Sequence, residues 1–227
     1  SYLDSNIIGF FNILELAKKY KIKKILYASS SSVYGNQNGP FKETHNTDKP
    51  LQFYAVTKKT NELMAHSYHH LHNISFVGLR FFTAYGPWGR PDMALYKFSN
   101  EIVSNKDIIL FNKGNYLRDF TYIDDIIEGV LGSLNYLIKK STNKKIYKIF
   151  NIGRGKPIKV IQYLKLIEKN LGKKAKVLLK DKRKTDANIT HASLNEINKH
   201  LKYSPKINIE EGIFKFINWY KRYYNDE

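Results

Sequence analysis

The chain has 227 residues, 42% of them hydrophobic, which is enough to bury a substantial core in one large domain or two small ones. It contains no cysteine, which excludes disulfides, thiolate catalysis and cysteine-ligated zinc, and no run approaches the roughly 20 apolar residues of a membrane span. We therefore expect a cytoplasmic protein without a membrane partner, whose chemistry depends on hydroxyl, carboxylate, amine or imidazole groups or on an organic cofactor.

The formal net charge of +18 raises the question of a nucleic-acid partner, because basic surfaces attract phosphate groups. Of the 38 basic residues 32 are lysines, and they are spread along the whole chain. The sequence contains neither a basic helix nor the aromatic and basic signature of a known nucleic-acid reader. We therefore favour a solvated basic surface and expect no nucleic-acid partner, whereas an anionic small substrate is compatible with the charge.

The hydrophobic pattern predicts helices that alternate with strands. Apolar residues with helical spacing come first, at Ile7, Phe11, Leu14 and Ala17, and segment 21–29 follows as a buried strand. After a polar loop, the pattern predicts a helix over 53–72, a strand over 74–81 and a loop over 85–92. A helix over 93–104, a strand over 108–111, a helix over 123–139 and a strand over 147–152 follow. The last predicted elements are a helix after Pro157, a strand over 175–179 and a helix over 209–224. Such alternation is typical of a parallel α/β sheet.

The sequence does not contain the usual start of a dinucleotide-binding sheet, which is a strand, a Gly-rich turn and a helix whose N-terminus faces the pyrophosphate. The one similar segment, GRGKPI (153–158), has Ile158 in place of a third glycine, and we interpret it as a turn into a helix that Pro157 opens. Because the chain also begins inside an expected helix, we expect it to lack an N-terminal half-domain and, as given, to bind a dinucleotide weakly or not at all.

The segment YAVTK places a phenol and an amine four residues apart, which puts Tyr54 and Lys58 on one face of a helix. A nearby ammonium favours the phenolate form and so allows a tyrosine to act as a base. The spacing alone is weak evidence, because chance predicts about two such pairs in a chain with 17 tyrosines, and three occur. They are Tyr20/Lys24, Tyr54/Lys58 and Tyr136/Lys140.

The segment SSSSVYG (29–35) distinguishes the second pair, because it follows an apolar strand at the end where open α/β sheets place their ligands. Ser30 lies 24 residues before Tyr54, and its hydroxyl is suited to hydrogen-bond a substrate oxygen whose proton Tyr54 removes. Together with LRFFTAYGPWGRPDMA (79–94) and RDFTYIDDI (118–126), these motifs resemble the extended short-chain dehydrogenase/reductase (NAD-dependent epimerase/dehydratase) family, and within it the UDP-glucuronate 4-epimerases. The resemblance runs in order over nearly the whole chain.

The resemblance implies a fold of the α/β class: a partial Rossmann-like parallel sheet with a smaller C-terminal α/β subdomain that binds the substrate. Residues 1–82 are expected to be the C-terminal part of the NAD-binding Rossmann domain, whose N-terminal Gly-rich part would be missing. Residues 83–227 are expected to be mainly the substrate-binding subdomain, with about 123–152 returning to the Rossmann domain. Family members commonly form homodimers, here through helices 4–19 and 53–72.

By the same resemblance, Ser30, Tyr54 and Lys58 align with the catalytic serine, the acid/base tyrosine and the lysine that holds the nicotinamide ribose of NAD. All three therefore also contact this cofactor, and Asn6 and Phe82 match two further cofactor-contacting positions. The family resemblance thus predicts that NAD binds against the helix that carries Tyr54.

Six polar residues are implied near the UDP-sugar substrate. They are Ser31, Ser32, Thr83, Arg90, Arg118 and Arg183. Arg118 and Arg183 fall where the family places arginines on the nucleotide diphosphate, a role that suits a bidentate guanidinium. The run of four serines leaves the register open by one, so Ser31 and Ser32 stay candidates for the catalytic serine.

The residues after the catalytic serine distinguish the reactions within the family. Dehydratases carry an Asp-Glu pair there and decarboxylases a Glu, whereas this chain has Ser31 and Ser32. The resemblance therefore implies a NAD-dependent 4-epimerase, most closely of UDP-glucuronate and UDP-galacturonate, that forms a 4-keto sugar and reduces it on the other face. Another epimerase, a dehydratase or a decarboxylase of the family is one alternative. A truncated, non-catalytic remnant that binds a sugar nucleotide or nucleic acid is the alternative from a different class.

Two groups of potential metal ligands have simpler interpretations. RDFTYIDD (118–125) holds three aspartates, which the resemblance assigns to structure. The histidines between 66 and 72 lie on one helix, without an HExxH motif or a visible third ligand. We therefore expect no metal.

Overall fold

A three-stranded parallel sheet forms the centre of one half of the molecule. The computed structural model describes residues 1–142, 144–183 and 185–225. The strands are β1 (Lys24–Ser30), β2 (Ser75–Phe81) and β7 (Tyr147–Ile152), in the order β1-β2-β7. In the middle strand, every residue from Ser75 to Arg80 is buried, as expected of a parallel strand that is covered on both faces.

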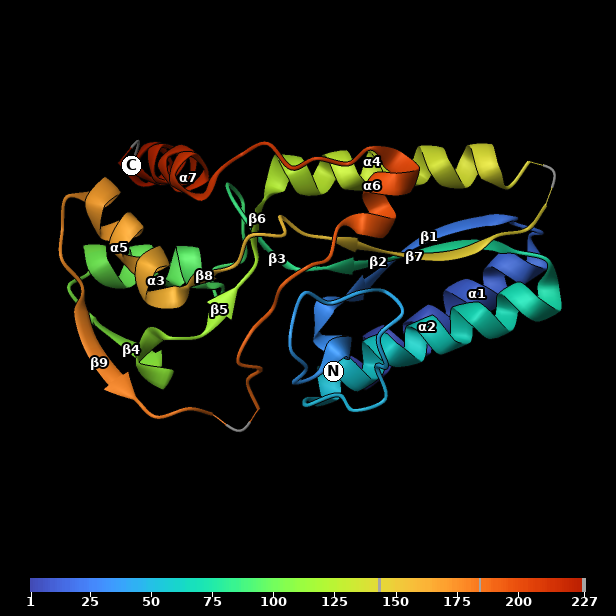
Figure 1. Ribbon diagram of the computed structural model, residues 1–227, viewed down its shortest axis with the longest axis horizontal. Coiled ribbons are helices and arrows are strands. Elements are labelled where there is room, and N and C mark those ends of the chain that lie inside the picture. The colour runs from blue at the N-terminus through green and yellow to red at the C-terminus, as the bar shows by residue number, and fades with distance from the viewer. Residues whose placement is uncertain (143, 184, 226–227) are drawn as a thin grey trace.

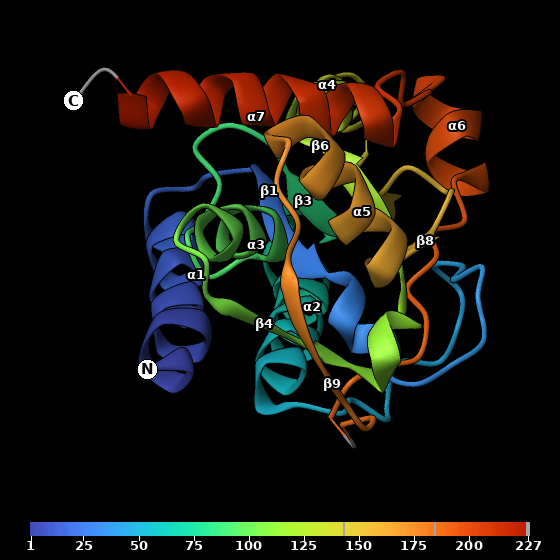
Figure 2. The same cartoon turned by 90° about the vertical axis from the view of Figure 1, so that its left-hand side faces the viewer.

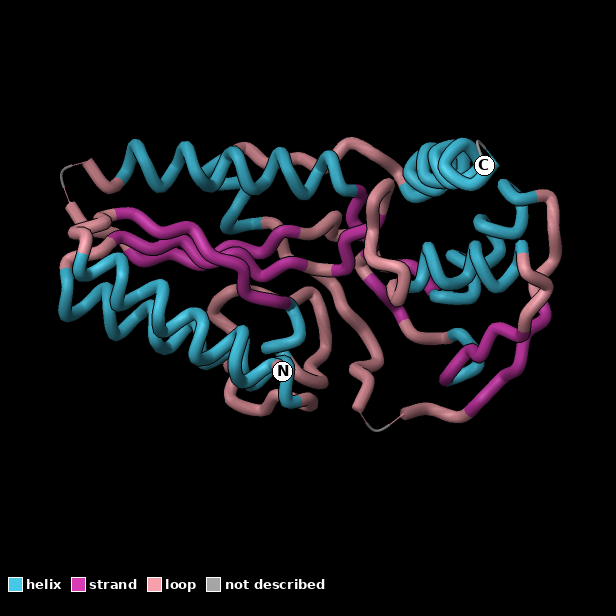
Figure 3. Tube along the Cα trace, turned by 180° about the vertical axis from the view of Figure 1, so that it is seen from behind, coloured by secondary structure: helices cyan, strands magenta, loops and turns pink. Residues whose placement is uncertain are grey.

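Helices cover both faces of this sheet (Figure 1). One face carries η1 (Leu3–Ile8), a short π-helix, which continues into α1 (Gly9–Lys19), and α2 (Phe53–His72); the other carries α4 (Ile123–Lys140) and α6 (Asn195–Leu201). Leu14, Ala65 and Phe76 belong to the core on the first face, and Ile126 and Phe150 to the core on the second. Figure 3 shows the same layers from behind. The predicted parallel α/β architecture is confirmed.

The other half of the molecule is built around α3 (Ala94–Val103), α5 (Val160–Leu171) and α7 (Ile209–Asn225). The parallel strands β4 (Asp107–Phe111) and β9 (Lys176–Lys180) lie beside these helices, as Figure 2 shows. Its core is strongly aromatic, and the rings of Phe120 and Tyr163 stack there at 3.9 Å between centroids. Helices and strands are thus present in both halves, while the domain boundary at residues 82 and 83 stays a prediction.

Short strand pairs connect the two halves. β3 (Thr83–Tyr85) pairs in parallel with β6 (Phe120–Tyr122), and β5 (Leu117–Arg118) pairs antiparallel with β8 (Ile158–Lys159). Between them, the buried Asp119 carboxylate accepts hydrogen bonds from the backbone N–H groups of Arg154, Gly155 and Ala192, each at 2.9 Å. Asp119 therefore holds three chain segments together, which is the structural role expected of it.

The helix expected to open at Pro157 begins at Val160 instead. Residues 158–159 are extended because they pair with residues 117–118, so tertiary pairing overrides the helix-opening tendency of proline. Helix α6 and the strands of two or three residues have no periodic signal, so the sequence does not predict them. Within the described ranges, no helix combines the length and the apolar character needed to cross a membrane.

Candidate active site

A cavity of about 640 Å³ opens at the carboxyl ends of β1 and β2, the end at which parallel α/β sheets bind ligands. The end of β1 with the following turn, the first turns of α2, and residues 81–93 form most of its wall. The cavity gathers seven of the residues predicted for the site. They are Ser30, Ser31, Tyr54, Lys58, Phe82, Thr83 and Arg90. Motifs that are far apart in the sequence thus meet at one place.

Tyr54 and Lys58 lie one helical turn apart at the beginning of α2. The Lys58 Nζ atom is 6.0 Å from the centre of the Tyr54 ring and donates a hydrogen bond of 3.1 Å to the carbonyl oxygen of Ala28 in β1. Burial lowers the pKa of Lys58 from its ordinary value of 10.5. The Tyr2 ring packs against Tyr54, with the centroids 5.2 Å apart. The amine is therefore fixed beside the phenol by both the strand and the helix.

Ser30 ends β1 and caps the short 3₁₀-helix η2 (Ser31–Tyr34). Its Oγ atom accepts hydrogen bonds from the backbone N–H of Ser32 at 3.2 Å and from the Ser32 hydroxyl at 2.9 Å. Because a hydroxyl has two acceptor positions and one proton, the Ser30 proton is left to be donated to an oxygen in the cavity. This arrangement favours Ser30 among the candidate serines.

A buried ion pair joins the sheet to α2 next to the serine segment. Arg80 of β2 donates two hydrogen bonds of 2.8 Å to the Glu62 carboxylate, and the Ser29 hydroxyl donates one of 2.6 Å to the same group. Each of the three residues is only 3% exposed. The sequence motifs give neither Glu62 nor Arg80 a role, and Arg80 has one signal, which is a charge within an otherwise buried strand.

The opposite wall of the cavity is formed by β3 and the loop over 86–92. Phe82, just before β3, is 4% exposed and belongs to a cluster of buried aromatic residues. Arg90 forms an exposed ion pair with Asp92, and this carboxylate raises the pKa of Arg90 above its ordinary value. Tyr2 and Trp88 also line the cavity. Tyr2 lies outside the quoted motifs, and Trp88 lies in the motif over 79–94 but is not singled out there as a site residue.

A second cavity, of about 150 Å³, shares Ser31 with the first. Ser32 and Arg118 line it together with polar residues of the segment that contains Asp186. Burial lowers the pKa of Arg118, and the Asp186 carboxylate opposes this effect. A guanidinium beside two hydroxyl groups is suited to bind a phosphate group.

Two predicted residues line neither of these cavities. The Asn6 side chain donates a hydrogen bond of 3.0 Å to Thr57 Oγ1 and so connects η1 to the first turns of α2. The Arg183 guanidinium lies 3.5 Å from the centre of the Phe111 ring. Their contacts with NAD and with the diphosphate, which the resemblance implies, stay predictions.

Two histidines of α2 have partners other than a metal. The Nδ1 atom of His69 is 2.8 Å from the carbonyl oxygen of Ile74, and the His66 ring packs against Tyr147 at 5.1 Å between centroids. Across the part of the chain that the structure describes, no group of three or more metal-ligating side chains is found.

A parallel sheet that brings a serine, a tyrosine and the lysine four residues after it to one cavity is the arrangement of the short-chain dehydrogenase/reductase class. The chain belongs to the NAD dependent epimerase/dehydratase family, whose sequence pattern matches residues 1–153. The resemblance noted in the motifs is thereby confirmed.

Relatives with high similarity include Protein CapI of Staphylococcus aureus, which is 45% identical over 99% of this chain and 71% of its own length. UDP-glucuronate 4-epimerase 3 of Arabidopsis thaliana is 44% identical over 99% of this chain and 55% of its own length. A crystal structure of UDP-glucuronic acid 4-epimerase from Bacillus cereus, in complex with UDP-glucuronic acid and NAD, matches with a TM-score of 0.90 and 32% identity, over 98% of this chain and 69% of that one. The chain thus spans 55% to 71% of the length of these three proteins.

Proposed function

We propose that the full-length protein is a NAD-dependent nucleotide-sugar 4-epimerase that interconverts UDP-glucuronate and UDP-galacturonate. The proposal rests on the convergence of Ser30, Tyr54 and Lys58 in one cavity, together with the finding that no described Asp or Glu lines this cavity. The site thus offers a proton-transfer group for a sugar hydroxyl, but no carboxylate for an elimination. The relatives named as UDP-glucuronate 4-epimerases support the substrate class.

In the proposed reaction, Tyr54 removes the proton of the sugar 4-hydroxyl while Ser30 donates a hydrogen bond to the same oxygen. Lys58 places its amine 6.0 Å from the centre of the Tyr54 ring, beside the group that exchanges the proton. After the sugar has turned over in the cavity, Tyr54 returns the proton to the oxygen on carbon 4. Tyr54 therefore acts as a base in the first half of the reaction and as an acid in the second.

The cofactor NAD, when bound, accepts a hydride from carbon 4 and gives it back. The residues present fit the nicotinamide end of this group, because the cavity lies at the carboxyl ends of parallel strands and its volume of about 640 Å³ is within the range of small-molecule sites. Lys58 and Tyr54 would hold the nicotinamide ribose, and Phe82 would contribute to the apolar wall. Asn6 would influence the cofactor site indirectly, because its hydrogen bond connects η1 to α2.

The two cavities that share Ser31 suit the two ends of a UDP-sugar. Arg118 would bind the diphosphate in the smaller cavity, where a guanidinium can form two parallel hydrogen bonds to phosphate. In the larger cavity, Thr83 and Arg90 would contact the sugar, and the charge of Arg90 favours a uronate carboxylate over a neutral hexose. Arg183 would contact the diphosphate only after its guanidinium moves away from the Phe111 ring.

The proposed function is tested by incubating the full-length protein with UDP-glucuronate and NAD. We expect Tyr54→Phe to lower kcat by about 10²- to 10⁴-fold, the usual contribution of general acid–base catalysis. Tyr20→Phe is the matched control, because Tyr20 has a lysine at the same spacing but lies at the end of α1 and is 66% exposed. Near wild-type turnover by Tyr54→Phe would refute the role of Tyr54 as the acid and base.

The alternative of a non-catalytic remnant has its own test. Salt-sensitive binding of a DNA duplex without binding of UDP would favour it.

We also propose that the protein forms a homodimer through α1 and α2. Phe11, Ile13 and Leu16 of α1 and Phe53 and Leu63 of α2 are each at least 45% exposed. Large exposed apolar side chains on two helices that contact each other favour an interaction site, which two copies can cover symmetrically. Light scattering is expected to give twice the chain mass for the wild type and the monomer mass for Leu63→Glu, whereas a monomeric wild type would contradict the proposal.

A further inference from the structure

Trp88 has an unusual conformation for a large side chain at a binding site. It lies in the loop over 86–92 and lines the larger cavity, yet it is 75% exposed. Its φ of +59° is in the left-handed region, which is unfavourable for a bulky residue and persists only where the surroundings hold it. Gly86, two residues earlier, also has a positive φ, of +145°. The conformation of this loop therefore needs support from another part of the protein.

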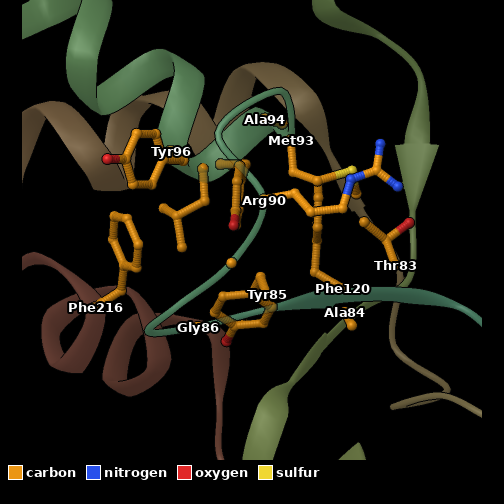
Figure 4. A pocket seen from close by; sticks show the side chains of 13 residues that line it. Thr83, Ala84, Tyr85, Gly86, Arg90, Met93, Ala94, Tyr96, Phe120 and Phe216 are labelled. Carbon is orange, nitrogen blue, oxygen red and sulfur yellow. The ribbon is translucent and has the colours of Figure 1, made fainter. Parts of the chain in front are cut away.

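The core contacts the loop closely at Gly86, where an added Cβ atom would lie 2.7 Å from Ile123 Cγ2, but it does not fill the space behind the rest of the loop. A small cavity of about 40 Å³ lies between the loop and the aromatic core of the second half (Figure 4). Gly86, Gly89 and Arg90 line it on the loop side, and Tyr163 and Phe216 line it on the core side. Atoms that face a void lose packing contacts, so the core alone does not fix the loop.

Further support comes from α7. The centroid of the Trp88 ring is 5.3 Å from that of Trp219 and 5.3 Å from that of Tyr223, and these two rings stack on each other at 5.2 Å. Trp219 also packs against the fully buried Phe216, at 5.5 Å between centroids. We call Trp88, Trp219 and Tyr223 the Trp88 cluster. Through it, an exposed loop is connected to a buried core.

We propose that the Trp88 cluster is a positioning device for the substrate: Trp219 and Tyr223 hold the loop over 86–92 on α7 and so keep Arg90 in the cavity wall. This inference rests on the proposed function, because Arg90 is the cationic contact proposed for the sugar. Trp219 and Tyr223 line neither that cavity nor the smaller one beside it, so they act through Trp88 and Arg90. The C-terminal helix thereby contributes to the affinity for the sugar nucleotide.

A spectroscopic test is possible because Trp88 and Trp219 are the two tryptophans of the whole chain. Within residues 1–227, Trp219→Phe leaves Trp88 as the one tryptophan, with an aromatic ring beside it, and Trp219→Ala removes that ring. We expect the fluorescence anisotropy of Trp88 to be lower in Trp219→Ala than in Trp219→Phe, because the indole and its loop become more mobile. This readout does not depend on enzyme activity.

The kinetic test uses the full-length protein. Trp219→Ala is expected to raise KM for UDP-glucuronate by about tenfold and to leave kcat within about twofold. The reason is that the lost aromatic contacts stabilise the loop conformation that binds the substrate. Trp219→Phe should restore KM to within about twofold of the wild type, again because an aromatic contact is kept. Phe214→Ala is the matched control, because Phe214 is an aromatic residue of α7 that is 55% exposed and lies outside the Trp88 cluster.

Two results would overturn the inference. An unchanged KM in Trp219→Ala together with lower anisotropy would show that the loop moves without affecting the substrate. An unchanged anisotropy would show that Trp219 does not hold Trp88. A wild type that neither binds nor converts UDP-glucuronate would refute the proposed function instead, and the anisotropy comparison would still decide whether α7 holds the loop.

Discussion

The ionisation of Lys58 depends on its surroundings. This residue is partly buried between α2 and β1, and its Nζ atom is held by the Ala28 carbonyl oxygen at 3.1 Å. Burial disfavours the charged amine and lowers the pKa of Lys58 from its ordinary value of 10.5. The amine therefore loses its proton at a lower pH than an exposed lysine, and the positive charge beside Tyr54 is lost with it.

The alkaline limb of the pH profile of kcat/KM is accordingly expected below pH 10.5. Lys58→Arg keeps a positive charge to above about pH 12. The alkaline limb measured on the residual activity of this variant should therefore move to higher pH. Initial rates of UDP-glucuronate conversion across the neutral and alkaline range measure the effect. A limb at the same pH in both proteins would show that another group causes it.

The residues of the site differ in how far the sequence predicts them. Ser30, Tyr54 and Lys58 lie in short motifs whose spacing is local, and the structure brings them together as expected. Glu62 and Trp88 gain their roles from partners in other elements, on β2 and on α7. Contacts between distant segments leave no periodic signal in the sequence, so the roles of these two residues are visible only in the folded molecule.

At the scale of elements, the ion pair between Glu62 and Arg80 joins α2 to β2 beside the serine segment. Both side chains are nearly inaccessible, and Ser29 of β1 hydrogen-bonds the same carboxylate. Removing one charge would leave the other buried without its partner, which is costly in a low-dielectric core, whereas replacing both with apolar groups avoids that penalty. The pair therefore fixes three elements around the start of the cavity.

Arg80→Met is expected to lower the free energy of unfolding by about 3–5 kcal/mol. The double variant Glu62→Leu/Arg80→Met should be markedly more stable than either single variant, because no unpaired charge is left. Urea denaturation of the wild type, the two single variants and the double variant measures these differences. Additive losses in the double variant would contradict this account of the pair.

Long periodic elements were predictable, and short ones were not. The helix predicted over 53–72 is α2, with the same ends, and the predicted strand over 147–152 is β7. Strands β5 and β8 contain two residues each and exist because they pair with each other. Pairing between segments 40 residues apart in the sequence follows from the fold, not from local propensity.

At the scale of the whole molecule, the cavity lies where the two halves meet. Strand β1 carries Ser30, and helix α2, which packs on the sheet, carries Tyr54 and Lys58. The chain that crosses into the second half carries Thr83 and Arg90. Family membership and the parallel α/β fold follow from the order of the motifs. The expected N-terminal half-domain with a Gly-rich turn stays a prediction, which the coding sequence upstream of Ser1 tests directly.

In the proposed reaction, a hydride leaves carbon 4 of UDP-glucuronate and returns to the other face of the same carbon. The most direct measurement is the reaction of the full-length protein with UDP-glucuronate that carries deuterium at carbon 4, in ordinary water with NAD. We predict UDP-galacturonate that keeps both its carboxylate and the deuterium at carbon 4. Release of carbon dioxide, a 6-deoxy product, or loss of the deuterium to water would contradict the account.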